Sequence, residues 1–486
     1  MANSFRNRII LGIDIEQTSA KKTYYVLDID YTITRAEEFR DRRNNKDFVT
    51  LLEKEALGKS AKTTGEAPAY IRHMRKFGIE WEPMSDTGHM RYGPEGAIII
   101  GLVHEYANQV VREIGVPVYN LLGTNMFRLS EKPVKQHADL FGDRLYQLSV
   151  DNEEFILRYA ACHQAFAMIK DWAISYKNLP FGTFEIADSY RFEQPGELML
   201  SFRLRRMNMP DLHIFVRDIE EAKRIFLEVH KKIYEIMGTL DRDYVSLYNT
   251  TSLEFIQSEK EFLNDLLKIE KKPVLVTVYP PGKDYYWILN VEYHITDVLG
   301  RPREIGTVQI DIGNAQRFGI KYIDKDGTEN YPIILHIALL GTVERFVYTL
   351  FDSALSKGEE KATLPTWISP TQVRLIPIAD RHVARANAIA DVFEENNIRV
   401  DIDDRSQTLQ RKVSEAEKHW IPYVIVIGDK EEASDEVMVR SRSTLTSNRK
   451  ALQEFIIEVK EETKGKPFKP LSYPRSLANR PIFSSP

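Results

Sequence analysis

The sequence predicts an α+β protein with a large antiparallel sheet, followed by a small α/β domain. Two observations carry this prediction. Several segments of the first 355 residues alternate apolar and polar side chains with period 2, and few helical patterns lie between them. Such segments are typical of strands with one buried and one solvated face. After residue 365, short apolar segments alternate with helical ones, which favours a mainly parallel sheet.

The first part of the chain is mixed, and its strands become clearer after residue 190. Tyr24–Thr34 alternates like a strand, and Asp47–Ala56 has a helical pattern. Glu197–Arg206 places apolar side chains on one face and arginines on the other, so we expect a strand there. Leu289–Ile295 and Thr307–Ile312 alternate likewise, and their polar faces are candidate ligand-binding surfaces. An ordinary solvent-exposed sheet face is the alternative.

A helix at Val343–Leu355 is expected to end this part, because its apolar residues recur at helical spacing. The expected elements that follow are Val373–Ile378, His382–Asn396, Ile398–Ile402, Leu409–Lys418 and Tyr423–Ile427. The expected organisation is an N-terminal extension (1–65), a first domain (66–355), a charged linker (356–365), an α/β domain (366–464) and a basic, proline-rich tail or strap (465–486).

Composition excludes several classes of protein. Hydrophobic residues make up 43 % of the chain and aromatic residues 10 %, which excludes a globally disordered chain. Lysine and arginine number 66 against 71 acidic residues, and the net charge of −5 excludes a histone-like basic protein. Cys162 is the only cysteine, so disulfides and four-ligand zinc sites that need two or four cysteines are excluded.

The expected location is the cytoplasm, without contact to a membrane. A single cysteine favours a reducing compartment. The apolar run Ala97–Val103 is far shorter than the ~20 residues of a membrane span. The N-terminal segment Met1–Gln17 lacks the apolar core and cleavage site of a signal peptide.

Two arginine-containing segments are candidates for binding an anion. Arg191 and Arg203 would share a polar face if two antiparallel strands flank the turn between them, and an arginine pair suits phosphate or carboxylate. Arg345 lies in the first turn of an expected helix, where backbone N–H groups already favour anions. The alternative is that these are surface arginines paired with neighbouring glutamates: Glu193, Glu197 and Glu344.

A third candidate is a metal site formed by Cys162, His213 and His336. Thiolate and imidazole are ligands that zinc prefers. The gaps of 51 and 123 residues between them are not diagnostic of a metal motif. A buried thiol beside two hydrogen-bonded histidines is therefore the alternative.

Taken in order, these segments resemble a class II aminoacyl-tRNA synthetase, and within that class the archaeal type of threonyl-tRNA synthetase. The resemblance runs from about residue 85 to residue 465. YRFE (190–193) is similar to the second signature motif of the class, and Gly341–Arg345 to the third. The other similar segments are ACHQAF (161–166), DLHIF (211–215), DYYWILNVEYHI (284–295), GTVQID (306–311), RFGI (317–320) and LHIALLGTVERF (335–346).

The resemblance implies a threonine–tRNA ligase, which activates L-threonine with ATP and then transfers it to tRNA(Thr). It also implies one zinc ion (Zn²⁺) per chain, held by Cys162, His213 and His336. Three protein ligands leave a fourth position open, as in catalytic zinc sites. Threonine would chelate the metal through its amino and hydroxyl groups, which valine cannot do. Asp211 would accept the hydrogen bond of the threonine hydroxyl, and Gln309 would contact the substrate.

The resemblance implies an ATP site as well, with Mg²⁺ bound to the nucleotide. Arg191 would hold the α-phosphate, and Arg345 would hold the γ-phosphate and stack on adenine. Arg203 would support the phosphates, and Glu193 the adenine or a nearby metal. Positioning and arginine charge would supply most of the catalysis.

The implied partners are tRNA(Thr) and a second copy of the chain. Glu431 and Arg440 match positions that read the anticodon in the family. The sequence departs from the family pattern elsewhere. Leu122 lies near the place of a proline that supports the dimer. Further departures fall in the second motif and in the helix before Glu431: Met207, Met209, Ser406, Ser414 and Trp420.

The N-terminal stretch also shapes the expected function. About 85 residues precede the resemblance, with His73 as their only histidine, which is too little for the editing domain of the family. We therefore expect a form that lacks the editing domain and makes seryl-tRNA(Thr), with a separate protein that edits in trans; editing before transfer is the alternative.

Other functions were weighed on the same residues. One is a catalytically inactive synthetase-like protein that binds RNA or regulates another enzyme. Another is a synthetase for serine or proline. The presence of Arg191, Arg345 and all three metal-type ligands favours the active enzyme, and the cysteine–histidine set argues against proline.

Overall fold

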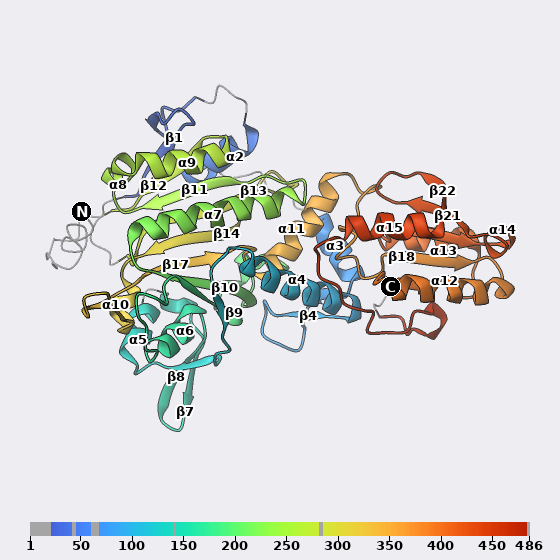
Figure 1. Ribbon diagram of the computed structural model, residues 1–486, viewed down its shortest axis with the longest axis horizontal. Helices are drawn as coiled ribbons and strands as arrows, with labels where there is room; N and C mark the ends of the chain where they lie inside the picture. Colours follow the sequence, from blue (N-terminus) through green and yellow to red (C-terminus); the bar gives the residue numbers. More distant parts are fainter. Residues whose placement is uncertain (1–20, 41–44, 60–67, 140, 281–284, 484–486) are drawn as a thin grey trace. The chain divides into compact units, whose positions relative to one another are not determined.

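The computed structural model describes residues 21–40, 45–59, 68–139, 141–280 and 285–483 (Figure 1). The segment Met1–Gln17, which we expect not to be a signal peptide, lies outside the described residues. The described chain forms two compact units. Unit one holds the described residues within Met1–Thr64, Ala107–Glu193 and Arg205–Arg345. Unit two holds those within Gly65–Tyr106, Gln194–Leu204 and Phe346–Pro486.

Unit one is built on a ten-stranded sheet with the order β2-β1-β12-β11-β13-β14-β17-β10-β9-β5. Neighbouring strands are antiparallel, except that β11 and β5 run parallel to β12 and β9. The predicted large antiparallel sheet is thus confirmed. The strands are β1 (Thr23–Leu27), β2 (Ile33–Arg35), β5 (Val118–Asn120), β9 (Phe181–Tyr190), β10 (Arg206–Val216), β11 (Val245–Thr250), β12 (Val274–Val278), β13 (Trp287–Thr296), β14 (Pro302–Asp311) and β17 (Ile333–Ala338).

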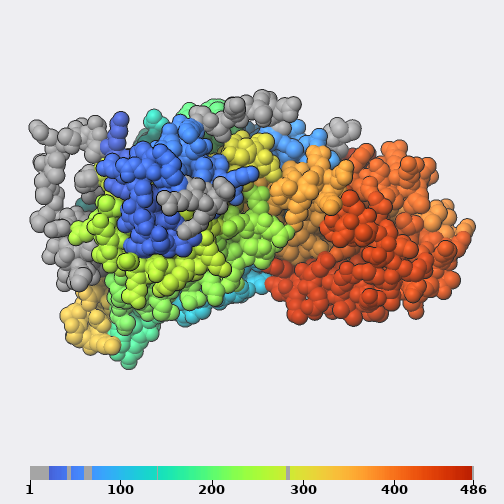
Figure 2. All heavy atoms as spheres, turned by 90° about the horizontal axis from the view of Figure 1, so that it is seen from above, coloured from blue at the N-terminus to red at the C-terminus, as the bar shows by residue number. Residues whose placement is uncertain are grey.

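The remaining elements of unit one surround this sheet. The helices are α2 (Lys46–Glu55), α5 (Lys132–Ala138), α6 (Cys162–Ile169), α7 (Ile219–Gly238), α8 (Leu253–Ser258), α9 (Lys260–Glu270), α10 (Asn314–Phe318) and the first turn of α11 (Val343–Ser356). Two small sheets contain β6 (Met126–Arg128), β7 (Gln147–Val150) and β8 (Glu153–Leu157), and β15 (Tyr322–Ile323) and β16 (Glu329–Asn330). Figure 2 shows the blue segment of β1, β2 and α2 against yellow-green residues of the same unit.

The two faces of the large sheet are covered differently. Helix α7 begins at Asp218, whose side chain accepts a hydrogen bond from Glu221 N, and it runs across β14 and β17 (Figure 1). Helices α7 and α9 meet the sheet through buried polar contacts, in which Tyr248 on β11 donates to Glu270 at 2.6 Å. Because side chains alternate along a strand, Asn249 points to the opposite face. That opposite face carries the candidate site.

Two predicted strands differ from the structure. The strand expected at Glu197–Arg206 is wrong: the segment forms a turn, with a left-handed residue at Ser201 (φ 61°), and β10 begins only at Arg206. A left-handed residue breaks an extended strand, because the chain reverses direction there. The strand expected at Tyr24–Thr34 is divided into β1 and β2 by a turn with Tyr31 at φ 67°.

Unit two contains a five-stranded sheet with the order β19-β18-β20-β21-β22. Strand β18 (Val373–Pro377) runs parallel to β19 (Val400–Ile402) and β20 (Tyr423–Ile427), whereas β21 (Glu436–Ser441) and β22 (Ser447–Ala451) add antiparallel pairs. The sheet is therefore mixed rather than mainly parallel. Its helices are α12 (Val383–Glu395), α13 (Leu409–Lys418), α14 (Asp429–Glu432) and α15 (Leu452–Glu462).

The same unit includes α3 (Ala69–Lys76), β3 (Ile79–Trp81), β4 (Met90–Tyr92) and most of α4 (Pro94–Arg112). The basic tail also packs here: Lys466 Nζ donates to the Tyr106 hydroxyl at 3.0 Å, and Ser476 forms a parallel bridge with Ile402. Among the helices of the described residues, none has the length and apolarity that crossing a bilayer requires.

Candidate active site and metal centre

A row of polar residues crosses the middle of the unit-one sheet. The register of β9, β10, β17, β14 and β13 places these residues opposite one another in turn: Thr183, His213, His336, Gln309 and Asn290. Directly opposite residues of an antiparallel pair have Cβ atoms about 4.5–5.5 Å apart. Strand register therefore joins residues that are far apart in the sequence.

The two histidines of this row meet the cysteine at the start of α6. One ligand atom each of Cys162, His213 and His336 lies within 4.8 Å of the others. His213 is only 2 % exposed, and its Nε2 has no hydrogen-bond partner among the described residues. A buried polar atom without a partner is costly. A metal ion bound here would satisfy that nitrogen, so the donor set fits a metal centre.

Burial controls the protonation of these ligands. It lowers the pKa of His213 well below its ordinary value, and the nearby His336 and Arg158 lower that pKa further. Neutral imidazole is the form that binds metals. Burial also raises the pKa of the Cys162 thiol far above its ordinary value. A bound cation would oppose that rise, since thiol ligands coordinate as thiolates.

Carboxylates next to the histidines hold this centre in place. Asp311 Oδ2 lies 2.7 Å from His336 Nε2, and the Oδ1 of Asp311 accepts hydrogen bonds from the backbone N–H groups of Gly313 and Asn314. Such a contact orients the ring of a metal-binding histidine. Asp211 Oδ2 lies 3.4 Å from His213 Nε2, and burial raises the pKa of Asp211 to about 6.

A buried ion pair that the sequence interpretation did not include supports the cysteine. Arg158 is 1 % exposed and donates to both carboxylate oxygens of Glu185, at 2.8 and 2.6 Å. It also donates to the carbonyl oxygen of Ala161, directly before Cys162. An arginine within the apolar segment FILRYAA (155–161) is the signal that could have identified this pair.

Gln309 lies in the same row and is held by an aromatic residue. The hydroxyl of Tyr286 donates to Gln309 Oε1 at 2.9 Å. Gln309 is directly opposite His336 in the register of β14 and β17. The structure therefore brings Gln309, Asp211 and the three metal-type ligands to one part of the sheet.

Arg191 and Arg345 surround a common carboxylate. Arg191 follows β9, and its Nε donates to the carbonyl oxygen of Tyr159 at 3.2 Å. Arg345 Nη1 lies 3.3 Å from Glu304 Oε2 and donates to the Glu304 carbonyl oxygen at 3.0 Å. Burial lowers the pKa of Arg191, and Arg345 lowers that pKa further. Burial raises the pKa of Glu304. The positive charges of Arg345 and then of His294 and Arg191 lower it by more, so the pKa of Glu304 lies below its ordinary value.

The turn before α11 fixes the position of Arg345. Gly341 has φ 68°, and a Cβ there would lie 1.9 Å from the Ile305 carbonyl oxygen, so only glycine fits. Glu344 accepts the backbone N–H of Asn208 with both carboxylate oxygens, at 3.0 Å each. Arg345 is thus paired with Glu304, while Glu344 binds the backbone of β10.

The other two residues of the implied ATP site have different surroundings. In unit two, Arg203 Nη1 lies 3.3 Å from Glu197 Oε2, and the two side chains are 39 % and 40 % exposed. This geometry is the surface pair named as the alternative. Glu193, in unit one, is 6 % exposed, and its backbone oxygen accepts a hydrogen bond from Arg205 Nε at 2.8 Å.

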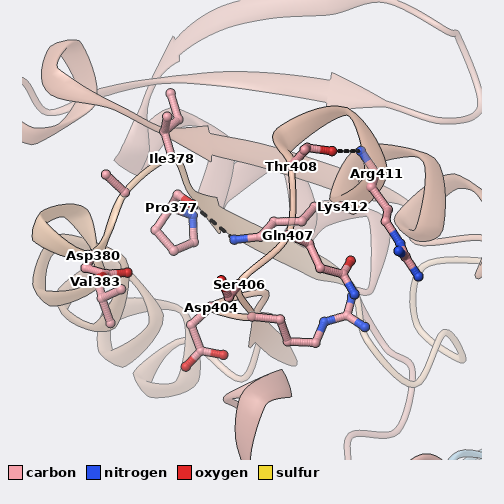
Figure 3. A pocket seen from close by; sticks show the side chains of 12 residues that line it. Pro377, Ile378, Asp380, Val383, Asp404, Ser406, Gln407, Thr408, Arg411 and Lys412 are labelled. Carbon is pink, nitrogen blue, oxygen red and sulfur yellow. Dashed lines mark hydrogen bonds between the residues drawn. The ribbon is translucent and has the colours of Figure 1, made fainter.

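The residues expected to read the anticodon lie in unit two, each with its own partner. Glu431 Oε2 accepts the backbone N–H of Gly428 at 3.2 Å. Arg440 Nη2 donates to Glu417 Oε1 at 2.6 Å. A cavity of about 540 Å³ opens near the carboxyl ends of β18 and β19 (Figure 3). Since β18 has parallel neighbours on both sides, this is the point of an α/β sheet where ligands commonly bind.

Family models match two parts of the chain. The model described as "tRNA synthetase class II core domain (G, H, P, S and T)" matches residues 146–354. The model described as "Anticodon binding domain" matches residues 372–462.

Curated relatives match most of the chain. It is 51 % identical over 463 residues to the threonine–tRNA ligase of Thermofilum pendens, covering 95 % of this chain and 75 % of the relative. It is 52 % identical over 437 residues to the threonine–tRNA ligase of Pyrobaculum arsenaticum, covering 90 % and 71 %.

Two solved structures share the fold at lower identity. One is described as the RNA binding domain of threonyl-tRNA synthetase from Cryptosporidium parvum, with a TM-score of 0.71, 22 % identity, and 82 % of this chain and 98 % of that chain covered. The other is prolyl-tRNA synthetase from the same organism, with a TM-score of 0.62, 18 % identity, and 83 % and 78 % covered.

Proposed function

Because the chain belongs to the threonine–tRNA ligase family, we propose that Cys162, His213 and His336 hold a zinc ion that selects threonine. The chain is an enzyme of this family, a class II synthetase that uses ATP with Mg²⁺. The observation that carries the zinc proposal is the buried Nε2 of His213, which lacks a hydrogen-bond partner beside two further metal-type ligands. A zinc ion here would act as a Lewis acid with one position open for substrate.

Threonine is distinguished from valine by its hydroxyl group. In our proposal Asp211 accepts the hydrogen bond of that hydroxyl, and Gln309 contacts the substrate from the next strand but one. A site that leaves polar groups unpaired rejects an analogue that lacks the hydroxyl by about 10⁴–10⁵, whereas an apolar pocket achieves about 10–200 for one methylene. Tyr286, which donates to Gln309, keeps the amide oriented.

In the proposed first step the arginines bind the triphosphate while the threonine carboxylate attacks the α-phosphorus. The new carboxyl–phosphate bond replaces the bond to the β-phosphate, and pyrophosphate leaves. We assign the α-phosphate to Arg191, and the γ-phosphate and the adenine face to Arg345. The mutual repulsion of two half-buried guanidinium groups near Glu304 supports this assignment, because an anionic ligand would relieve it. Arg203 and Glu193 are the further residues that we propose for ATP binding.

The second step passes threonine to the tRNA. We propose that the α/β domain (366–464) binds the anticodon of tRNA(Thr) through Glu431 and Arg440, in agreement with the domain model that matches there. The proposed boundaries of the other parts stay those expected from the sequence: an N-terminal extension (1–65), a catalytic domain (66–355), a linker (356–365) and a basic tail (465–486).

The chain is proposed to act as a cytoplasmic homodimer. Strand β5 is an edge strand of the ten-stranded sheet, bonded only to β9 among the described strands. Beside it Tyr119 is 54 % exposed and Leu122 87 %. Apolar side chains at an open sheet edge favour association with a second copy, and the apolar Leu122 can serve where the family has a proline.

We propose that the 486 residues do not clear seryl-tRNA(Thr) and that a separate protein edits it in trans. Serine keeps both groups that chelate zinc and lacks only a methyl group, which a binding pocket discriminates by about 1–3 kcal/mol. Purified protein incubated with preformed seryl-tRNA(Thr) should deacylate it at the spontaneous rate. Hydrolysis well above that rate contradicts the proposal.

The decisive experiment for the whole function is ATP–pyrophosphate exchange with a panel of amino acids. We expect exchange with threonine, weaker exchange with serine, and none above background with valine or proline. Exchange with proline but not threonine contradicts the zinc-based selection. Loss of exchange with every amino acid favours the other function considered, an inactive synthetase-like RNA-binding protein.

A further inference from the structure

The tail after α15 is tied to unit two along its length; we call residues 465–483 the strap. Near its start, Lys469 Nζ lies 3.6 Å from Glu105 Oε1 on α4. Further on, the backbone oxygen of Arg475 accepts the N–H of Ile402 at 2.8 Å, so the strap runs beside β19, the edge strand of the five-stranded sheet. Covering an edge strand satisfies its free backbone groups.

The strap holds a loop that lines the cavity of unit two. This loop, residues 403–408, joins β19 to α13, and Asp404 is one of the cavity-lining residues labelled in Figure 3. Ser476 Oγ donates to Asp404 Oδ2 at 2.6 Å, and the backbone N–H of Ala478 donates to Asp404 Oδ1 at 2.9 Å. Both carboxylate oxygens are therefore occupied by the strap.

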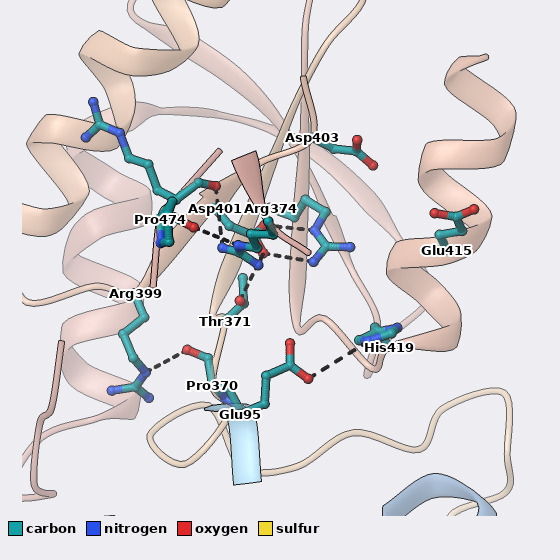
Figure 4. Close-up of polar contacts among 12 residues, drawn as sticks. Glu95, Pro370, Thr371, Arg374, Arg399, Asp401, Asp403, Glu415, His419 and Pro474 are labelled. Atoms are coloured by element: carbon teal, nitrogen blue, oxygen red, sulfur yellow. Dashed lines mark hydrogen bonds and ion pairs between the residues drawn. The ribbon is translucent and has the colours of Figure 1, made fainter. Parts of the chain in front are cut away.

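A second contact reaches the buried end of the same strand. Asp401 is fully buried, and Arg374 donates to both of its oxygens at 2.8 Å (Figure 4). Arg480 of the strap adds a third charged contact, with its Nη1 3.1 Å from Asp401 Oδ2. Arg480 thus anchors the strap at Asp401, in the strand that leads into the loop of Asp404.

Apart from Asp404, the charged residues that line the cavity are three cations and one carboxylate: Arg405, Arg411, Lys412 and Asp380. Arg405 is locked in place by two hydrogen bonds to Asp403 and one to Glu415, at 2.7–2.8 Å. Arg411 and Lys412 also line the cavity. Fixed cations attract the phosphates of RNA, whereas an unbonded Asp404 carboxylate at the same wall would repel them.

We propose that the strap is a positioning element for RNA: by donating to both carboxylate oxygens of Asp404 through Ser476 and Ala478, it weakens the negative charge that Asp404 presents to the cavity and fixes the loop that presents Arg405. The RNA is the anticodon arm of tRNA, so the inference rests on the proposed function of the α/β domain. Ser476 and Arg480 are positioning residues, because they act through Asp404 and Asp401.

The test uses the full chain and four variants. Ser476→Ala removes the hydrogen bond to Asp404, and Ser476→Thr retains it. Arg480→Gln removes the anchor at Asp401, and Lys469→Gln removes the same charge from the other end of the strap. Each protein is assayed for ATP–pyrophosphate exchange, and for kcat and KM of aminoacylation with a tRNA(Thr) transcript and with an anticodon-substituted transcript.

We expect Ser476→Ala and Arg480→Gln to raise the KM for tRNA(Thr) about tenfold, the usual effect of losing a hydrogen bond to a charged group. ATP–pyrophosphate exchange should be unchanged in both, and Ser476→Thr and Lys469→Gln should keep the KM of the unaltered chain. If Ser476→Ala and the unaltered chain have equal KM values for tRNA(Thr), the strap inference alone is overturned. It is also overturned if Lys469→Gln raises this KM as much as Arg480→Gln does. If the unaltered chain charges both transcripts equally well, the anticodon proposal and the strap inference are both overturned.

Discussion

The described residues contain two groups of three metal-type ligands, and they differ in a way that separates a centre from a surface cluster. In unit one, His213 and His336 are buried and Cys162 is half-buried. In unit two, His382 is buried, but its neighbours Asp429 and Glu432 are exposed, with side-chain exposures of 73 % and 46 %. Both groups have ligand atoms within 4.8 Å of one another.

The difference lies in how their donor atoms are already used. His213 Nε2 has no hydrogen-bond partner among the described residues. In the second group, His382 Nε2 lies 2.8 Å from Asp429 Oδ1, and Arg381 donates to the same carboxylate at 2.8 Å. A group whose charges are balanced by an arginine gains little from a cation. His382 Nδ1 is also buried without a hydrogen-bond partner among the described residues, so neither proximity nor an unpaired nitrogen makes a metal site alone. The two groups differ because two of the three ligands of the second group are exposed, and one of these, Asp429, is already paired with Arg381.

The largest effect is expected when one ligand of the first group, Cys162, is replaced. Cys162→Ser should reduce zinc from one equivalent per chain to well below one, and should abolish threonine activation, because a serine hydroxyl is a poor zinc ligand. Elemental analysis of the purified protein and ATP–pyrophosphate exchange measure the two effects. Full activity in this variant contradicts the zinc assignment.

The second-largest effect is expected when one of the two arginines assigned to the phosphates of ATP is removed. Arg191→Ala and Arg345→Ala should each slow adenylate formation by about 10²–10³, the usual loss when one group that stabilises transition-state charge is removed. Single-turnover rates with threonine and ATP measure this loss. Arg128→Ala, which removes a surface arginine paired with Glu153, serves as the control and should react at the unaltered rate.

A smaller effect concerns a buried carboxylate of unit two, Glu95, whose Oε2 lies 3.9 Å from His419 Nε2 (Figure 4). Burial raises the pKa of Glu95 to about 7. The folded state therefore binds a proton more tightly than the unfolded state, and this contribution to stability is lost as pH rises from about 4.5 to 7. Glu95→Gln should become more stable than the unaltered chain by at most about 3 kcal/mol at pH 8, and equal to it near pH 4.5.

Urea unfolding at several pH values measures this difference in the free energy of unfolding. Parallel pH profiles for the two proteins would show that Glu95 keeps an ordinary pKa.

The smallest effect belongs to the second group of ligands. His382→Ala should leave the zinc content at one equivalent and the rate of threonine activation unchanged, since Arg381 already pairs with Asp429. Elemental analysis of this variant beside Cys162→Ser compares the two groups directly. A fall in zinc content here would mean that the surface cluster also binds the metal.

Local sequence patterns predicted the elements of unit two from β18 to β20, but not α14, β21, β22 and α15, which follow them. The bounds expected for α13 and β20 match the structure, because each apolar pattern ends at a residue that stops the element, as Gly428 does after Ile427. The strand expected at Glu197–Arg206 is wrong, since its period-2 pattern does not show that Ser201 adopts a left-handed conformation. Helix α7 was not predicted, although its apolar residues recur at helical spacing from Ala222 to Met237.

Only part of the candidate site could be predicted from the residues and their spacing. The types of Cys162, His213 and His336 could be identified, but their convergence depends on the register between β10 and β17, which no local pattern fixes. The same holds for Arg158, which directly follows β8, and Glu185 on β9, which belong to different parts of unit one. The resemblance to a known family supplied the juxtaposition that spacing could not.

The central claim is that one thiolate and two imidazoles hold zinc in this chain. X-ray absorption at the zinc edge of the purified protein tests it most directly. We expect one sulfur neighbour at about 2.3 Å and nitrogen neighbours at about 2.0–2.1 Å. A zinc shell without sulfur, or with more than one sulfur atom, would contradict it.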